Sequence, residues 1–246
     1  MPRTWIVALV AVTACHAGRP QPAPDVIRQL DEARRQFRHG DFTPALAGFR
    51  RLTFELTPGD ASLPEVKYLA AECQYQLGAF AEAAHDFRDV ADQFPQSPYA
   101  PTALLRAGDA NLRMWRDPSL DPSPGEAALA LYQELAGRFP GSDAAARAQL
   151  HVAELKEWFA EKEYRNGMFY LRRRAYDSAI LYFKDLIANY PETPRAGDAL
   201  LRLADAYKVI GYTDELRDVC ANVRQYHPTL VPQARSCPPD SAAAPN

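Results

Sequence analysis

The amino-acid sequence predicts an all-α protein, a superhelix of about five helix-turn-helix units. Two observations lead to this prediction. From Val26 onward, segments rich in Ala, Leu, Arg and Glu alternate with short breaks at Gly or Pro, and no stretch shows the sustained period-two alternation that is typical of a strand. A short set of residue types also recurs at regular spacing. Together they indicate one helical unit that is repeated along the chain.

The repeated set is an alanine, an aromatic residue four positions later and a closing proline, with a glycine before them in several units. The first two units have Gly40, Phe42, Ala45, Phe49 and Pro58, then Gly78, Phe80, Ala83, Phe87 and Pro95. The next two have Ala128, Tyr132 and Pro140, then Ala179, Phe183 and Pro191; a weaker fifth copy is Gly211, Leu216, Cys220 and Pro228. Alanine lets paired helices approach, the ring fills the gap, glycine takes the turn and proline ends the helix.

The third and fourth units are longer than the others. The extra residues of the third form a Pro-rich loop between its helices, at 116–124. Those of the fourth lengthen its first helix, which we expect to run from Asp143 to about Arg173 in one or two pieces.

The predicted repeats occupy residues 26–228, with N-terminal repeats at 26–100 and C-terminal repeats at 101–228. The remaining residues, 229–246, are rich in Pro, Ala and Ser, and we expect them to form a disordered tail.

The repeat resembles the tetratricopeptide motif, which has about 34 residues per unit. A single unit of this kind cannot bury its own apolar face, so neighbouring units stack. The resulting superhelix has a concave surface that is lined by the first helix of each unit and can hold an extended peptide or a partner helix.

The N-terminus has the layout of a secretory signal. Residues 1–14 have a basic start, an apolar stretch and small residues at the end. The tetrad Val12-Thr13-Ala14-Cys15 resembles a bacterial lipobox, which implies cleavage before Cys15 and acyl chains such as palmitate on that cysteine. Residues 15–25 are then a lipidated cysteine and a flexible tether. The alternative is a general secretory signal in which Cys15 is incidental.

Composition excludes several functions. A net charge of −3 and a pI near 6.0 do not suit a nucleic-acid binder. No hydrolase, kinase, metalloprotease or dinucleotide-binding motif occurs, and no His/Cys group has the spacing of metal ligands. We therefore expect no enzyme activity, catalytic residue, metal or cofactor.

The fourth unit carries the most specific resemblance to a known family. Its features are Leu155 to Ala160, Glu163-Tyr164, Phe169-Tyr170 and Ala175-Tyr176, followed by Tyr190-Pro191-Glu192-Thr193. With the lipobox, tether and repeats, this pattern resembles the BamD family of outer-membrane assembly lipoproteins, also called YfiO or ComL. The family often has an arginine in the second helix of this unit, where this chain has Tyr182.

The resemblance implies a lipid-anchored, non-enzymatic scaffold at the periplasmic face of the outer membrane. Its implied partners are a BamA-like insertase, other assembly-complex lipoproteins and unfolded outer-membrane proteins. The alternative function is a general envelope adaptor, similar to CpoB or to pilus-assembly lipoproteins, that uses the same repeats on other partners.

Two groups of residues are candidates for these contacts. Repeat register predicts that the peptide-binding groove contains Arg34, Phe37, Tyr68, Glu72, Tyr75 and Asp109. The predicted partner interface contains Arg172, Arg173 and Tyr182. The arginines precede a turn, where they could instead complement the dipole of the preceding helix or bind anionic headgroups.

The remaining candidates have packing or solvent roles. Cys73 and Cys220 occupy core positions of the repeat, and a Cys220–Cys237 disulfide is the alternative for Cys220. His151 and Glu154 share a helix face, and we expect a solvated pair.

Overall fold

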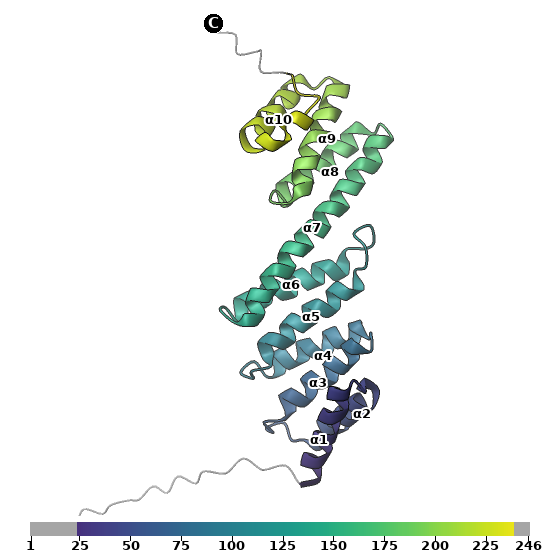
Figure 1. The fold of residues 1–246 in the computed structure, drawn as a ribbon, viewed down its shortest axis with the longest axis vertical. Helices are drawn as coiled ribbons and strands as arrows, with labels where there is room; N and C mark the ends of the chain where they lie inside the picture. The colour runs from purple at the N-terminus through teal and green to yellow at the C-terminus, as the bar shows by residue number, and fades with distance from the viewer. Residues whose placement is uncertain (1–23, 239–246) are drawn as a thin grey trace, which may run out of the picture.

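The computed structural model describes residues 24–238 (Figure 1). Cys15, the predicted signal peptide and most of the predicted tether lie outside the described residues, whereas Pro24 and Asp25 of that tether already belong to the first helix. Within this range there are ten α-helices and one 3-10 helix, and no strand. They are α1 (Pro24–His39), α2 (Phe42–Glu55), α3 (Leu63–Gln76), α4 (Phe80–Gln93), α5 (Ala100–Met114), α6 (Ser123–Arg138), α7 (Asp143–Arg172), α8 (Tyr176–Asn189), α9 (Pro194–Ile210), α10 (Thr213–Tyr226) and η1 (Pro228–Gln233).

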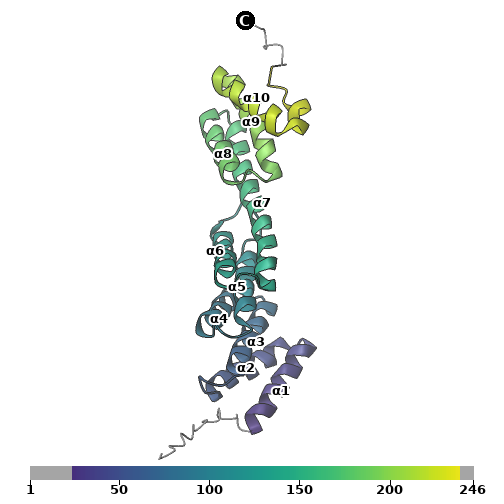
Figure 2. The same ribbon diagram turned by 90° about the vertical axis from the view of Figure 1, so that its left-hand side faces the viewer.

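The ten helices form five successive pairs that stack along one axis into an elongated superhelix (Figures 1 and 2). The predicted all-α tetratricopeptide architecture is confirmed. Each helix packs on the next one in the chain, and the first helices of several neighbouring pairs also touch, as α1 does with α3, α5 with α7, and α7 with α9. Second helices make no comparable contacts with one another. The first helices therefore form the inner face of the stack.

In four of the five pairs, all except α5–α6, the turn between the two helices is closed by a residue in the left-handed conformation. Gly40, Gly78 and Gly211 take this position with φ of 84°, 81° and 80°. At the α7–α8 turn the same conformation falls on Arg174, with φ of 61°. A side chain with a Cβ is strained in this region, so this turn costs more than its glycine counterparts.

In the third and fourth repeats the aromatic ring of the second helix fits against a glycine on the preceding helix. A Cβ added to Gly108 would lie 2.4 Å from the Tyr132 ring, and one added to Gly167 would lie 2.5 Å from the Phe183 ring. The rings of Tyr132 and Phe183, and that of Phe87 in the second repeat, are at most 1% exposed. The two inner-helix glycines therefore allow full insertion of the rings.

Three core clusters run along the stack, and α7 belongs to two of them. The first core joins α1 to α3, and the second extends from Ala71 to Phe159, across the expected boundary at residue 100. The third joins the C-terminal half of α7, from Ala160, to α8 and α9. The long first helix of the fourth unit is one unbroken helix of 30 residues. It connects the two halves of the molecule (Figure 2).

The loop between α5 and α6 is attached to the middle of α7. Asp117 accepts hydrogen bonds from the backbone N–H and hydroxyl of Ser119, and it pairs with Arg165 at 3.1 Å. These hydrogen bonds and then the arginine lower the pKa of Asp117. Lys162 Nζ donates to the carbonyl of Leu120 at 3.0 Å. The loop therefore braces α7 where the third core begins.

The prediction of a disordered tail is wrong for residues 229–238. This segment forms η1 and a following turn, and Cys237 is joined to Cys220 by a disulfide. Ser236 also donates a hydrogen bond to Asp205 of α9 at 2.6 Å. Composition alone could not show these tertiary links. Cys220 is buried as expected, but it is bonded rather than a packing thiol, whereas Cys73 is a free buried thiol.

No helix in the described range is both long and apolar enough to span a bilayer.

Candidate functional site

Charged pairs link neighbouring first helices along the inner face. Arg34 of α1 binds Glu65 of α3 through two hydrogen bonds of 2.8 and 2.6 Å. The same arrangement joins Glu72 of α3 to Arg106 of α5. Farther along, the inner faces of α7 and α9 are joined in the same way, because Glu161 accepts a hydrogen bond from Arg195 at 2.5 Å.

The centre of this face is a cluster around Arg106. Its guanidinium donates to Glu72 at 2.6 and 2.9 Å and to Asp109 at 3.1 Å, and it stacks on the Tyr75 ring at 3.8 Å from the ring centre. Burial disfavours the charge, but Glu72 and Asp109 outweigh it and raise the pKa of Arg106. On the other side, Tyr132 donates its hydroxyl to Asp109 at 2.9 Å. We call Glu72, Tyr75, Arg106, Asp109 and Tyr132 the Arg106 cluster.

His151 extends the cluster onto α7. Its ring is stacked on Tyr132, with centroids 5.3 Å apart, and its Nε2 lies 3.6 Å from Asp109. The expected partner, Glu154, lies at a similar 3.7 Å. His151 is therefore a link between first helices as well as one half of a solvated pair.

Three of the six predicted groove residues meet in the Arg106 cluster: Glu72, Tyr75 and Asp109. Arg34 lies on the inner face but is paired with Glu65, whose hydrogen bonds are the main cause of its raised pKa. Phe37 packs edge-on against Phe42 and Phe49 in the first core, so the structure gives it a packing role.

Tyr68, the sixth predicted groove residue, lies half-buried between the Phe87 and Tyr99 rings, at 5.4 and 5.3 Å. Burial, followed by the nearby Glu72 carboxylate, raises its pKa to about 12. Its ring forms part of the floor of the inner face.

Arg106 was absent from the set of predicted site residues. The only sequence signal for it was the repeated Ala-Leu-Leu-Arg segment that contains Arg106 and Arg202. An arginine at the same register of two first helices indicates a role common to both units. In the structure each of them pairs with the aspartate three residues later, Asp109 and Asp205.

The predicted partner residues lie at the other end of the stack, where α7 meets α8. The Tyr182 ring stacks on Tyr170 at 5.3 Å, and the Arg173 guanidinium lies 3.5 Å from the centre of the exposed Phe169 ring. A pocket of about 570 Å³ lies here, and its lining includes Phe169, Tyr170, Arg172 and Tyr182. We call it the α7–α8 pocket. Within residues 24–238, Arg172 has no carboxylate partner.

A stack of helix pairs with a charged, aromatic inner face and an aromatic pocket defines a class of protein, the repeat scaffolds that bind other polypeptides. Comparison with known proteins shows which family of this class the chain belongs to. The model of the YfiO family, described as an outer membrane lipoprotein, matches residues 28–221, and the chain belongs to this family.

Curated relatives carry one name. The chain is similar to the outer membrane protein assembly factor BamD of Vibrio cholerae, with 29% identity over 213 residues that cover 87% of this chain and 77% of the relative. It is also similar to the protein of the same name in Xylella fastidiosa strain Temecula1, with 25% identity over 92% of this chain and 82% of the relative.

Solved structures of tetratricopeptide proteins are more distantly similar to this chain. The TPR2AB domain of yeast Sti1, in its pHSP90 complex, has 15% identity and a TM-score of 0.46 and covers 83% of this chain and 78% of its own. A thermophilic TPR protein of Thermus thermophilus has 21% identity and a TM-score of 0.39, and the match covers 86% of this chain and 96% of that protein.

Proposed function

We propose that this protein is a non-enzymatic scaffold that takes part in the assembly of β-barrel proteins into the outer membrane. The observation that carries the proposal is the YfiO family match over residues 28–221, almost the whole described chain. The name shared by the relatives, outer membrane protein assembly factor, supports it. The scaffold works by holding other chains in position and needs no catalytic group.

The inner face is the proposed site for unfolded outer-membrane proteins. Because Arg106 is fully engaged by Glu72 and Asp109, it is not free to capture a carboxylate. Recognition then depends on the rings of Tyr75 and Tyr68 and on α7, where Leu150 is 72% exposed. Aromatic and aliphatic groups of this kind suit an extended segment with apolar side chains.

The α7–α8 pocket is the proposed contact for a BamA-like insertase. Its stacked rings give a rigid apolar surface, and the neighbouring arginines supply positive charge that can meet acidic side chains of a partner. Tyr182 offers a ring and a hydroxyl here, so the contact does not depend on an arginine at that position.

The anchor is proposed to be the lipid on Cys15, which would hold the scaffold at the outer membrane facing the periplasm. Several acyl chains on one residue give stable membrane attachment where one chain would be marginal.

Site-specific photocrosslinking in cells tests the two surfaces separately. A photoreactive residue at Tyr75 should crosslink to an outer-membrane protein during its synthesis, and one at Tyr182 should crosslink to a BamA-type barrel. Matched controls are the exposed Glu82 on α4 and Asn189 on α8, which should give neither product. Recovery of division or pilus proteins alone would contradict the proposal and favour a general envelope adaptor.

A further inference from the structure

A second apolar surface lies on the outer side of the last repeat. Helices α8 and α10 form the walls of a cleft of about 390 Å³, and α9 forms its floor. The lining is mostly apolar and includes Ile187, Leu200, Leu203, Tyr207 and Val219. We call it the α8–α10 cleft. Its two walls are second helices, and none of its lining residues belongs to the Arg106 cluster or to the α7–α8 pocket.

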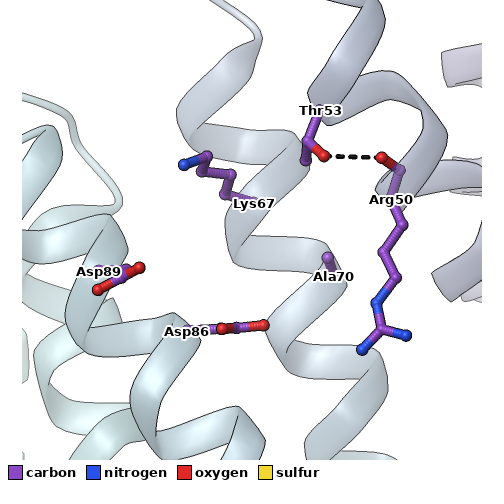
Figure 3. Close-up of a pocket in the computed structure, with 6 residues that line it drawn as sticks. All are labelled: Arg50, Thr53, Lys67, Ala70, Asp86 and Asp89. Atoms are coloured by element: carbon purple, nitrogen blue, oxygen red, sulfur yellow. Dashed lines mark hydrogen bonds between the residues drawn. The ribbon is translucent and has the colours of Figure 1, made fainter.

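The same position near the other end of the stack has a polar lining. There, a pocket of about 160 Å³ lies between α2 and α4 over α3, and its six lining residues are shown in Figure 3. Superimposing the repeated glycine and aromatic positions pairs every one of these residues with a lining residue of the α8–α10 cleft. The pairs are Arg50 with Lys184, Thr53 with Ile187, Lys67 with Leu200, Ala70 with Leu203, Asp86 with Val219 and Asp89 with Asn222.

The polar pocket shows which side chains the helix packing requires at these positions. Helices α2, α3 and α4 pack against one another although Thr53, Lys67 and Asp86 occupy the cleft positions. Figure 3 shows the Thr53 hydroxyl bonded to the carbonyl oxygen of Arg50. The repeat therefore does not need large apolar side chains there. Ile187 and Val219 pack against the third core on one side, and as half-buried residues each leaves the rest of its side chain open to the cleft. An open cleft whose walls and floor are apolar, at a position that is polar elsewhere in the same fold, points to a binding surface.

The rim of the cleft carries negative charge on one wall. Glu215 and Asp218 of α10 line it, and neither has an ion-pair partner within residues 24–238, whereas the facing wall of α8 contributes Lys184. Glu215 lies close enough to Tyr207 to add to the effect of burial, which raises the pKa of that phenol. Two unmatched carboxylates beside an apolar floor favour a ligand with basic groups next to its apolar side chains.

We propose that the α8–α10 cleft is a docking site for a segment of another protein that places two or three apolar side chains in the cleft and lysine or arginine against Glu215 and Asp218. The chain's own last residues, 239–246, do not suit it, since they contain no large apolar side chain and include Asp240. This interaction is additional to the proposed function, which uses the inner face and the α7–α8 pocket.

A defined probe tests the proposal on the purified full chain. The probe is a fluorescent amphipathic peptide with leucines on one face and lysines at its edge, and a second peptide has glutamate in place of each lysine. Fluorescence anisotropy should show binding of the lysine peptide and at least about tenfold weaker binding of the glutamate peptide. Methyl NMR shifts should localise the lysine peptide to Leu200 and Leu203.

Two double variants separate the apolar and charged contributions. Ile187→Thr with Val219→Asp installs the residues of the α2–α4 pocket, and we expect the affinity for the lysine peptide to fall at least about tenfold. Glu215→Lys with Asp218→Lys changes only exposed residues, and it should weaken the lysine peptide and strengthen the glutamate peptide. The matched control, Thr53→Ile with Asp86→Val, should leave both affinities unchanged.

Circular dichroism and melting curves establish that each variant is folded. The proposal is overturned if the lysine peptide does not bind, if its shifts fall outside the cleft, or if the two cleft variants bind it as the wild type does. Crosslinking from Tyr75 and Tyr182 should be the same in the cleft variants as in the wild type, so failure of this docking site is distinguishable from failure of the proposed function.

Discussion

Arg106 donates two hydrogen bonds to the carboxylate of Glu72, at 2.6 and 2.9 Å, and thereby joins the inner faces of α5 and α3. The two side chains are only 19% and 12% exposed. A pair with so little access to water depends on both partners, because removing either one leaves a largely buried charge with too few partners: Arg106 would keep only Asp109, and Glu72 only the amide of Gln76. The centre of the inner face is therefore a structural link, and under the proposed function client contact falls to the rings around it.

Removing one member of this pair should be strongly destabilising. We expect Glu72→Ala to lower the free energy of unfolding by about 3 kcal/mol, because Arg106 keeps only Asp109 as an acceptor. The control is Asp31→Ala. The side chain of Asp31 is 57% exposed and lies 3.3 Å from Arg34, so its loss should lower the free energy of unfolding by less than about 1 kcal/mol. Urea unfolding monitored by circular dichroism measures both. Equal losses would show that the Glu72 pair is no more than a surface ion pair.

The glycine facing Tyr132 should not tolerate a methyl group. The Cβ of Gly108→Ala would lie 2.4 Å from the ring, so we expect a loss of about 2 kcal/mol as α5 and α6 move apart. Gly137 of α6 has open space around it, and Gly137→Ala should instead gain about 0.5 kcal/mol from helix propensity. Thermal melts compare them. A Gly108→Ala protein as stable as the wild type would contradict this close ring contact.

The α7–α8 turn should be improved by glycine. Arg174 has φ of 61°, so Arg174→Gly removes a strained Cβ, and we expect it to raise stability by about 1 kcal/mol. Gly211→Ala, at a turn with φ of 80°, should lower stability by a similar amount. Chemical unfolding of both variants gives the two differences. A loss of stability in Arg174→Gly would indicate that the arginine side chain contributes more than its backbone strain costs.

Tyr68 should make the protein sensitive to alkali. Its pKa is about 12 in the folded protein and 10.0 as the ordinary value, so its contribution to stability is complete below pH 10 and is lost as pH rises toward 12. At pH 11 the loss is about 1 kcal/mol. Tyr68→Phe keeps the ring but cannot ionise, so its stability should fall less between pH 9 and pH 11. Unfolding measured at both pH values tests this, and parallel losses in the two proteins would exclude the effect.

The helix pairs were predictable because each is specified locally. Glycine at a turn, alanine opposite a ring and proline after a helix act within one unit, and their recurrence gives the order of the units. The length of α7 was also predictable, since the run from Asp143 contains no Gly or Pro until Gly167, and that glycine packs against Phe183 rather than ending the helix.

The links between units were not predictable in the same way. Arg106 joins Glu72 to Asp109, and this link depends on how α3 and α5 lie side by side. Repeat register predicted only that Glu72 and Asp109 face inward. Phe37 was assigned to the groove for the same reason, although a ring near a turn can equally pack on the following helix. The ordered segment after α10 depends on a disulfide and on the contact with Asp205, which composition cannot reveal.

The unbroken α7 has a consequence for how a captured chain would be handed on. His151 and Arg172 lie on the same helix, and at 1.5 Å of rise per residue they are about 30 Å apart. A straight helix held by packing at both ends changes length very little, and the α5–α6 loop braces its middle. The distance between the proposed client site on the inner face and the proposed partner site at the α7–α8 pocket is thus set by the number of residues between them in one helix. Inserting a single helical turn into α7 would lengthen that distance with little relative rotation of the two surfaces. The efficiency with which a client is transferred between them would then show how strongly transfer depends on the distance.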